Sequence, residues 1–179
     1  MKCLASEHTD VRAPAESVFD YVSDLARWPT WFACVVSAAA PEDKPLAQGV
    51  EVHVCMHAGR RRWQENFEVT RFIRNAFLSF ESFFSTARRI DFRFERRGQM
   101  TRLACSIGYP VYGGSLPAVY HAIVGRGRLR KALRDSLVHL KNILEERAGE
   151  TAAAEDYGRI DSAIGEVKAA VAAPSVRVG

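Results

Sequence analysis

The chain has 179 residues, and its 25 lysines and arginines against 21 aspartates and glutamates give a formal net charge of +4 with the histidines neutral. This length fits one domain, or one domain with an appendage. Hydrophobic residues make up 47% and charged residues 26%, as in soluble globular proteins, which excludes a disordered, collagen-like or low-complexity chain.

Composition and residue spacing also argue against several classes of protein and of binding site. No stretch approaches the roughly 18 uninterrupted apolar residues of a membrane-spanning helix, and the N-terminus lacks the apolar core of a signal peptide, so we expect a cytoplasmic protein. The four cysteines have neither CxxC nor zinc-ligand spacing, so we expect reduced thiols and no metal site. Because no phosphate loop, dinucleotide motif or nucleophile elbow is present, no cofactor is expected. The charge excess is too small to indicate nucleic-acid binding.

The beginning of the chain predicts a strand followed by two short helices. A strand is expected at 6–12, and Pro14 suits the first turn of a helix that extends to about Leu25. Trp28-Pro29 is expected to break that helix, because the residue before a proline is disfavoured in the α region. Residues 30–32 then form a second short turn that carries large aromatic side chains.

From about Cys34 to Tyr109 the hydrophobic period changes to two, which predicts about six antiparallel strands. The alternation of Val52, Val54 and Met56 with polar residues is a clear example. One face of the sheet is therefore predicted to be strongly aromatic and the other polar, as in an antiparallel sheet that is wetted on one side.

A long helix is predicted over 126–147, followed by an extension. Its apolar stripe lies at helical spacing and is expected to cross the aromatic face of the sheet. The stripe consists of Leu129, Leu133, Leu137, Leu140 and Leu144. Ala148-Gly149 is expected to end the helix. We therefore predict a domain over 1–148 and a helical or partly disordered extension over 149–179.

This order of elements predicts an α+β helix-grip fold, in which a curved antiparallel sheet wraps around a long C-terminal helix. Residues 11–38 contain Pro14-Ala15-Glu16-Ser17-Val18-Phe19 and Trp28-Pro29-Thr30-Trp31. They resemble the opening of the START/Bet v 1-like (SRPBCC) superfamily, in particular its bacterial polyketide cyclase/dehydrase-like group. Residues 65–70 and 137–145 also fit that pattern, and the resemblance covers about 5–148.

The resemblance implies a cavity between the sheet and the long helix that holds a hydrophobic small molecule. Members of the superfamily carry or sense lipids, sterols, quinones or hormones, and some cyclise polyketides. Our leading hypothesis is a binding protein for a hydrophobic or aromatic small molecule. The alternatives are a cyclase, dehydratase or aromatase-type enzyme of secondary metabolism, and a lipid or quinone carrier that docks on anionic membranes. Whether a reaction is catalysed, and the oligomeric state, stay open.

Large side chains of the short helices and of the aromatic sheet face, with two tyrosines from the connection between the last strand and the long helix, are the candidate ligand contacts. Ten phenylalanines, five tyrosines and three tryptophans favour a cavity, although aromatic side chains also pack into solid cores. The candidates are Trp28, Trp31, Phe32, Val54, Met56, Trp63, Phe67, Phe80, Phe84, Phe92, Tyr112 and Tyr120.

Polar residues on or near this face are candidates for acid–base chemistry. Glu65 shares a strand face with Trp63 and Phe67, where a carboxylate is unfavourable unless it is hydrogen-bonded, paired or protonated. Its alternative role is structural, at a strand edge or in a buried salt bridge to an arginine of the long helix. Tyr109 and His121 lie where the last strand leads to the long helix. They could donate to a ligand carbonyl, or simply pack with their polar tips in water.

Basic residues gather at the start of the long helix, including Arg126, Arg128 and Lys131. Positive charge there opposes the helix dipole, so helix stability does not explain it. An anionic ligand group or a phospholipid surface would compensate it; the alternative is a solvated face neutralised by the acidic extension. His53 and His57 share a strand face, but that face is predicted to be solvated and no third ligand follows, so no metal is expected.

Overall fold

The computed structural model describes residues 2–41, 45–58, 60–82, 88–109 and 127–150. Within these residues the chain forms a seven-stranded antiparallel sheet in the order β1-β7-β6-β5-β4-β3-β2. The strands are β1 (Lys2–Val11), β2 (Val35–Ala39), β3 (Glu51–Ala58), β4 (Arg61–Ile73), β5 (Phe77–Ser82), β6 (Arg89–Arg97) and β7 (Met100–Tyr109). Between β1 and β2 lie α1 (Ala15–Ser23), a 3-10 turn (Leu25–Arg27) and α2 (Trp28–Trp31). Residues 127–150 are helical and are called the C-terminal helix below.

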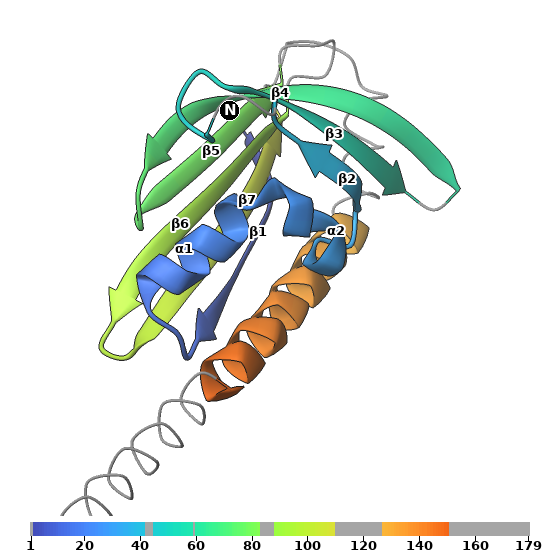
Figure 1. The fold of residues 1–179 in the computed structure, drawn as a ribbon. Helices are drawn as coiled ribbons and strands as arrows, with labels where there is room; N and C mark the ends of the chain where they lie inside the picture. The colour runs from blue at the N-terminus through green and yellow to red at the C-terminus, as the bar shows by residue number, and fades with distance from the viewer. Residues whose placement is uncertain (1, 42–44, 59, 83–87, 110–126, 151–179) are drawn as a thin grey trace, which may run out of the picture.

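The sheet curls, and α1, α2 and the C-terminal helix lie on its concave side (Figure 1). This is the predicted helix-grip architecture. Part of the curvature has a local cause in β4, a 13-residue strand whose pairing with β5 shifts register between Val69 and Arg71. Such a bulge bends a strand and increases its twist.

The first helix ends earlier than the sequence predicts. α1 starts directly after Pro14, whose carbonyl accepts the N–H of Val18 at 3.1 Å. It stops at Ser23 because Asp24 adopts an extended backbone and its carboxylate accepts the N–H of Ala26 at 3.2 Å. The expectation that Trp28-Pro29 breaks this helix is therefore wrong, and the proline instead occupies the first turn of α2.

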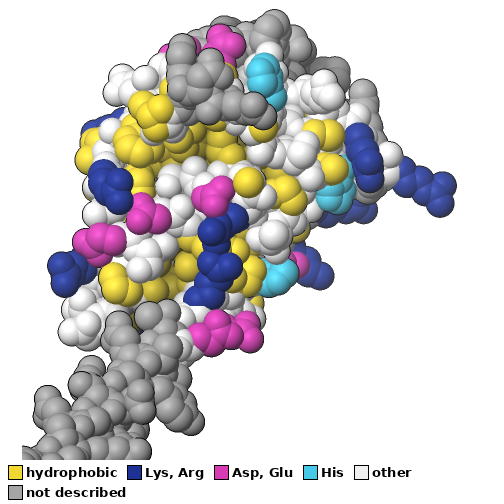
Figure 2. All heavy atoms as spheres, viewed as in Figure 1, with side chains coloured by type: hydrophobic (Ala, Val, Ile, Leu, Met, Phe, Trp, Pro, Cys, Tyr) yellow, Lys and Arg dark blue, Asp and Glu magenta, His cyan; other side chains and the backbone are white. Residues whose placement is uncertain are grey.

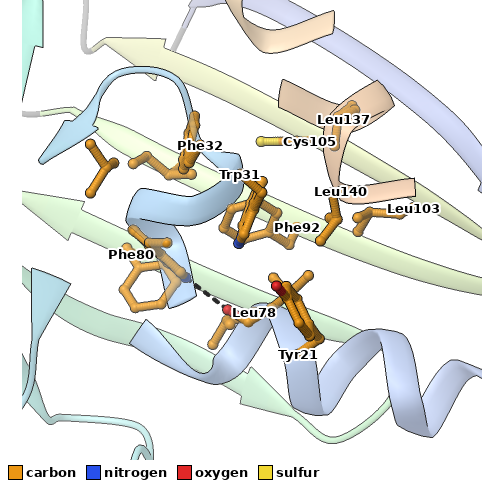
Figure 3. Packing of buried hydrophobic residues seen from close by; sticks show 14 of the residues in the cluster. Tyr21, Trp31, Phe32, Leu78, Phe80, Phe92, Leu103, Cys105, Leu137 and Leu140 are labelled. Carbon is orange, nitrogen blue, oxygen red and sulfur yellow. Dashed lines mark hydrogen bonds between the residues drawn. The ribbon is translucent and has the colours of Figure 1, made fainter. Parts of the chain in front are cut away.

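The leucine stripe of the C-terminal helix packs onto the concave face. Leu133, Leu137 and Leu140 are at most 1% exposed, whereas Val138 on the outer side of the helix is 49% exposed. Figure 3 shows Leu137 and Leu140 among core side chains of the sheet and α2. The hydroxyl of Ser136 also accepts the N–H of Ala33 at 3.0 Å, which joins the helix to the connection between α2 and β2.

The C-terminal helix continues through Gly149 to residue 150, so the prediction that Ala148-Gly149 ends it is wrong. A glycine that terminates a helix adopts the left-handed conformation. Among the described glycines, positive φ occurs at Gly49 and Gly98 and not at Gly149. The proposed extension beyond residue 150 lies outside the described residues. No described helix combines the length and the apolar character needed to span a membrane.

Arginines of the C-terminal helix pair with one carboxylate of the edge strand β1. Arg130 and Arg134 both donate to Oε1 of Glu7, Arg134 at 3.3 Å. The Glu7 side chain is only 11% exposed. The hydrogen bond from Arg130, followed by that from Arg134, lowers the pKa of the Glu7 carboxyl. Part of the positive charge at the start of the helix is thus neutralised by β1.

Other contacts fix the far end of the helix. The guanidinium carbon of Arg147 lies 5.1 Å from the ring centre of Tyr21 in α1, and that of Arg27 lies 4.9 Å from the same ring. The backbone N–H of Arg12 donates to Oε1 of Glu145 at 2.9 Å. This end therefore docks through one aromatic ring and through a backbone N–H that donates to Glu145, whereas the start docks through guanidinium–carboxylate ion pairs.

Leu137→Ala is expected to lower the free energy of unfolding by about 2–5 kcal/mol, because it opens a cavity in the core. Urea unfolding measures the loss. Val138→Ala is the matched control, and its expected change is within about 0.5 kcal/mol because the side chain lies on the exposed side of the same helix. Similar losses in both variants would contradict the orientation of the helix.

Glu7→Gln is expected to weaken the acid dependence of stability. The pKa of Glu7 is lower in the folded chain than its ordinary value of 4.5, so its contribution is complete above that value and is lost as pH falls through the folded pKa. The wild type should therefore be more stable than the variant by about 1 kcal/mol at neutral pH. Urea unfolding across the acid range should show this difference shrinking, and a constant difference would argue against the pairing.

Candidate functional site

Aromatic side chains of α2 and of the central strands fill one part of the concave side. Trp28 packs edge-on against Phe80 at 5.0 Å, Trp31 stacks on Phe32 at 5.0 Å, and rings of α2 also meet Phe92. Each of these rings is at most 1% exposed. We call this set the aromatic wedge (Figure 3). The burial of all five rings shows that in this conformation they belong to the core.

The remaining predicted ligand contacts are distributed differently. Val54, Met56 and Phe67 lie on the concave face of β3 and β4 and are 2–7% exposed, whereas Trp63 is only partly buried. Tyr109 ends β7 opposite Lys2. Other candidates lie outside the described residues, namely Phe84, Tyr112, Tyr120 and His121. Ligand contact by any of these side chains stays a prediction.

A polar cluster, made of Trp63, Glu65 and Arg88, interrupts the apolar concave face. Nη1 of Arg88 donates to Oε2 of Glu65 at 2.9 Å. The same oxygen accepts the indole N–H of Trp63 at 3.3 Å, and the guanidinium carbon of Arg88 lies 5.0 Å from the centre of the Trp63 ring. The side chain of Glu65 is 6% exposed and that of Arg88 is 21% exposed. The buried carboxylate is therefore both hydrogen-bonded and charge-compensated, as burial requires.

Of the roles predicted for Glu65, the buried salt bridge is present, but its partner is not an arginine of the long helix. Arg88 directly precedes β6 and reaches Glu65 of β4 just beyond the end of β5. Arg130 and Arg134 of the C-terminal helix bind Glu7 at the sheet edge instead.

The sequence analysis missed Arg88, although a signal for it existed. Ile90 and Phe92 are buried on the concave face of β6. Extending their two-residue alternation back by one step places Arg88 on the same face.

Chemically, the polar cluster offers oriented N–H donors next to an aromatic ring. Glu65 holds the guanidinium of Arg88 and the indole of Trp63 in fixed positions, because both donate to one oxygen. A guanidinium held in this way can hydrogen-bond a carbonyl or hydroxyl oxygen of a bound molecule. The flat face of an indole suits a ring-shaped, apolar ligand.

Hydrophobic side chains also gather in a hollow between α1 and the segment before β3 (Figure 2). Leu46 and Val50 of that segment and Phe72 of β4 are partly buried hydrophobic residues that pack against the core. An ion pair between Arg74 and Asp20 at 3.1 Å joins the turn after β4 to α1. The hollow is a second apolar region on the concave side.

Of the three residues predicted to contact an anionic partner, two lie in the described part of the chain. Arg128 and Lys131 are exposed, and Arg126 lies outside the described residues. Their neighbours Arg130 and Arg134 share the carboxylate of Glu7 of β1, which neutralises one of their two positive charges. An anionic partner at Arg128 and Lys131 stays a prediction.

No cluster suited to metal binding is found among the described residues. No three His, Cys, Asp or Glu side chains in these ranges gather closely enough to hold a metal ion. His53, on the exposed convex face, instead contacts Asn66, with Nδ1 2.8 Å from Oδ1. Burial raises the pKa of the Cys34 thiol, which keeps it protonated at neutral pH and weakens it as a nucleophile.

Residues 2–145 match the family described as "Polyketide cyclase / dehydrase and lipid transport". The chain belongs to this family. The family and the fold predicted from the opening motif are thereby confirmed. No curated protein matches the chain significantly.

Several solved structures share the fold. One is the Polyketide_cyc-like protein Cgl2372 from Corynebacterium glutamicum, with 19% identity, a TM-score of 0.60 and coverage of 82% of this chain and 94% of that one. Protein NE0264 from Nitrosomonas europaea has 8% identity and a TM-score of 0.64 over 83% and 99% of the two chains. The di-domain ARO/CYC StfQ from the steffimycin biosynthetic pathway has 15% identity and a TM-score of 0.62 over 80% and 51%.

Arg88→Met is expected to destabilise the fold more than Arg88→Met combined with Glu65→Gln. The single variant leaves the buried carboxylate without its counter-charge, a loss of about 3 kcal/mol, whereas the double variant removes that charge as well. Urea unfolding at neutral pH measures both. Arg74→Met is the control, because its ion pair with Asp20 is largely exposed and should contribute less than about 0.5 kcal/mol. Equal losses in the single and double variants would refute the charge compensation.

Proposed function

We propose that the chain binds an apolar, ring-containing small molecule on the concave side of the sheet, next to Trp63. The observation that carries the proposal is the buried Glu65–Arg88 pair beside a half-buried indole on an otherwise apolar face. A fold that needed only a core would do as well with hydrophobic residues there, because replacing a buried ion pair by apolar side chains is often neutral or stabilising. The pair is therefore better explained by ligand recognition.

The surroundings of the polar cluster fit such a ligand. Val54 pairs with Glu65 and Met56 pairs with Trp63 across the β3–β4 ladder, so apolar side chains flank the polar groups. Small-molecule sites are mostly apolar and contain a few placed polar groups that fix orientation. The family description, which names polyketide cyclases and lipid transport, supports a ligand of this kind.

A cyclase, dehydratase or aromatase-type reaction on a bound polyketide is the second candidate. The observation that favours it is the guanidinium of Arg88, because an oriented cation in apolar surroundings can stabilise negative charge that develops on a carbonyl oxygen. Glu65, Tyr109 and His121 are the residues proposed to move protons. The likeness to the ARO/CYC protein StfQ agrees with this candidate.

A lipid or quinone carrier that docks on anionic membranes has less support. It would use Arg128 and Lys131, but Glu7 neutralises one of the two positive charges of the neighbouring Arg130 and Arg134. The remaining positive surface is correspondingly smaller.

Trp63→Ala is expected to weaken binding of 2-naphthol, a small apolar ring probe, by about tenfold, because the ring loses its stacking partner. Equilibrium dialysis measures the affinity. Ile73→Ala, an exposed position at the other end of β4, is the control and should bind as the wild type does. Binding that is absent in the wild type, or equal in Trp63→Ala, would contradict the proposal. Native mass spectrometry of protein from its own host would identify the natural ligand by its mass.

A further inference from the structure

Ser82, the last residue of β5, carries a hydroxyl that the described fold does not use. The residue is fully buried, and its Oγ has no hydrogen-bond partner among the residues that the structure describes. A buried hydroxyl without a partner is less favourable than a methyl group in the same place. An alanine would therefore serve the core better, which points to a role for this hydroxyl outside folding.

The position of Ser82 in the sheet places it beside the polar cluster. Phe80, two residues earlier, is buried on the concave face, so Ser82 shares that face. The backbone N–H of Ser82 donates to the carbonyl of Arg88 at 2.8 Å, and on its other side Ser82 pairs with Phe67 of β4. Because β5 lies between β4 and β6, the ion pair from Glu65 to Arg88 crosses directly next to Ser82.

Together these groups offer hydrogen bonds without a net charge. Glu65 compensates the guanidinium of Arg88 at 2.9 Å. A ligand carboxylate would bring a second negative charge next to Glu65 in apolar surroundings, which is unfavourable. A hydroxyl or ketone oxygen can bond to Ser82 with no change of charge, because a serine hydroxyl both donates and accepts.

We propose that Ser82 and the Glu65–Arg88 pair form the head-group site for a neutral oxygen function, a phenolic hydroxyl or a ketone, of the apolar ring ligand. The assignment rests on the function proposed above and specifies its polar recognition. Trp63 and Arg88 are the more exposed members of the cluster. The ring of the ligand therefore lies against Trp63, and its oxygen points inward to Ser82.

The test compares three probes that differ only in the head group: naphthalene, 2-naphthol and 2-naphthoate. Equilibrium dialysis against the full chain should show 2-naphthol bound about fivefold more tightly than naphthalene, the effect of one neutral hydrogen bond. The uncharged 2-naphthol should also bind more tightly than 2-naphthoate. Ser82→Ala is expected to lower the affinity for 2-naphthol to that for naphthalene.

Two further variants separate the head-group site from general effects. Ser79→Ala is the matched control, because Ser79 is buried on the opposite face of β5 and its hydroxyl donates to Asp91 at 2.6 Å. It should keep the wild-type preference for 2-naphthol over naphthalene. Glu65→Gln should shift the preference toward 2-naphthoate, because it removes the negative charge that compensates Arg88.

The outcomes distinguish the head-group site from the proposed function on which it rests. Equal wild-type affinity for naphthalene and 2-naphthol, or an unchanged preference in folded Ser82→Ala, would overturn the head-group site and leave the proposed apolar binding in place. Loss of the preference for 2-naphthol in Ser79→Ala would also overturn the head-group site, because a serine on the opposite face of β5 would then matter as much as Ser82. Absence of binding by all three probes would overturn both the head-group site and the proposed function.

Discussion

The packing of α2 against the centre of the sheet is the contact on which the arrangement of the concave side depends. Trp28 and Trp31 lie against Phe80 and Phe92, and the indole N–H of Trp28 donates to the carbonyl of Val22 at 2.8 Å, which fixes the end of α1 to the same place (Figure 3). Rearranging the side chains of such a closely packed interior has a high free-energy cost. The aromatic wedge therefore decides which part of the concave side is solid core, and the proposed ligand site lies beside it, near the start of β4 and the end of β5.

Long repeating patterns made the fold predictable from the sequence. The alternation through Val52, Val54 and Met56, and the leucine stripe around Leu137, each extend over several turns or residue pairs, so the correct period stands out. Helix ends were harder to predict, because they depend on single local interactions. Asp24 ends α1 by accepting one backbone N–H, and Gly149 fails to end the C-terminal helix because it keeps a helical conformation. Neither helix end is marked by a repeating sequence pattern.

The candidate site was only partly predictable, for two physical reasons. A solid core and a ligand cavity select the same aromatic residue types, so the sequence could not separate the buried Trp28 from the partly exposed Trp63. Glu65 stood out as a charge on an apolar face, but its partner lies 23 residues away and is reached across the end of β5. That contact depends on the register of β4 with β5 and on the residue at which β5 ends. Ser82 lies on the same sheet face as the predicted contact Phe80. Serine occurs in many different surroundings, however, so its presence there did not indicate a ligand contact.

The C-terminal helix is held by different interactions at its two ends, so the two ends respond differently to dissolved ions. Its start is held by Arg130 and Arg134 on Glu7, with both guanidinium groups widely exposed, so dissolved ions screen these contacts. Its end is held by the guanidinium of Arg147 on the ring of Tyr21 and by the backbone N–H of Arg12 on the carboxylate of Glu145, and neither of these contacts pairs two full charges. Glu7 pairs with Cys105 in the middle of β7, whereas Arg12, which donates to Glu145, follows the last residue of β1. Rising ionic strength is therefore expected to weaken the contacts at the start of the helix more than those at its end.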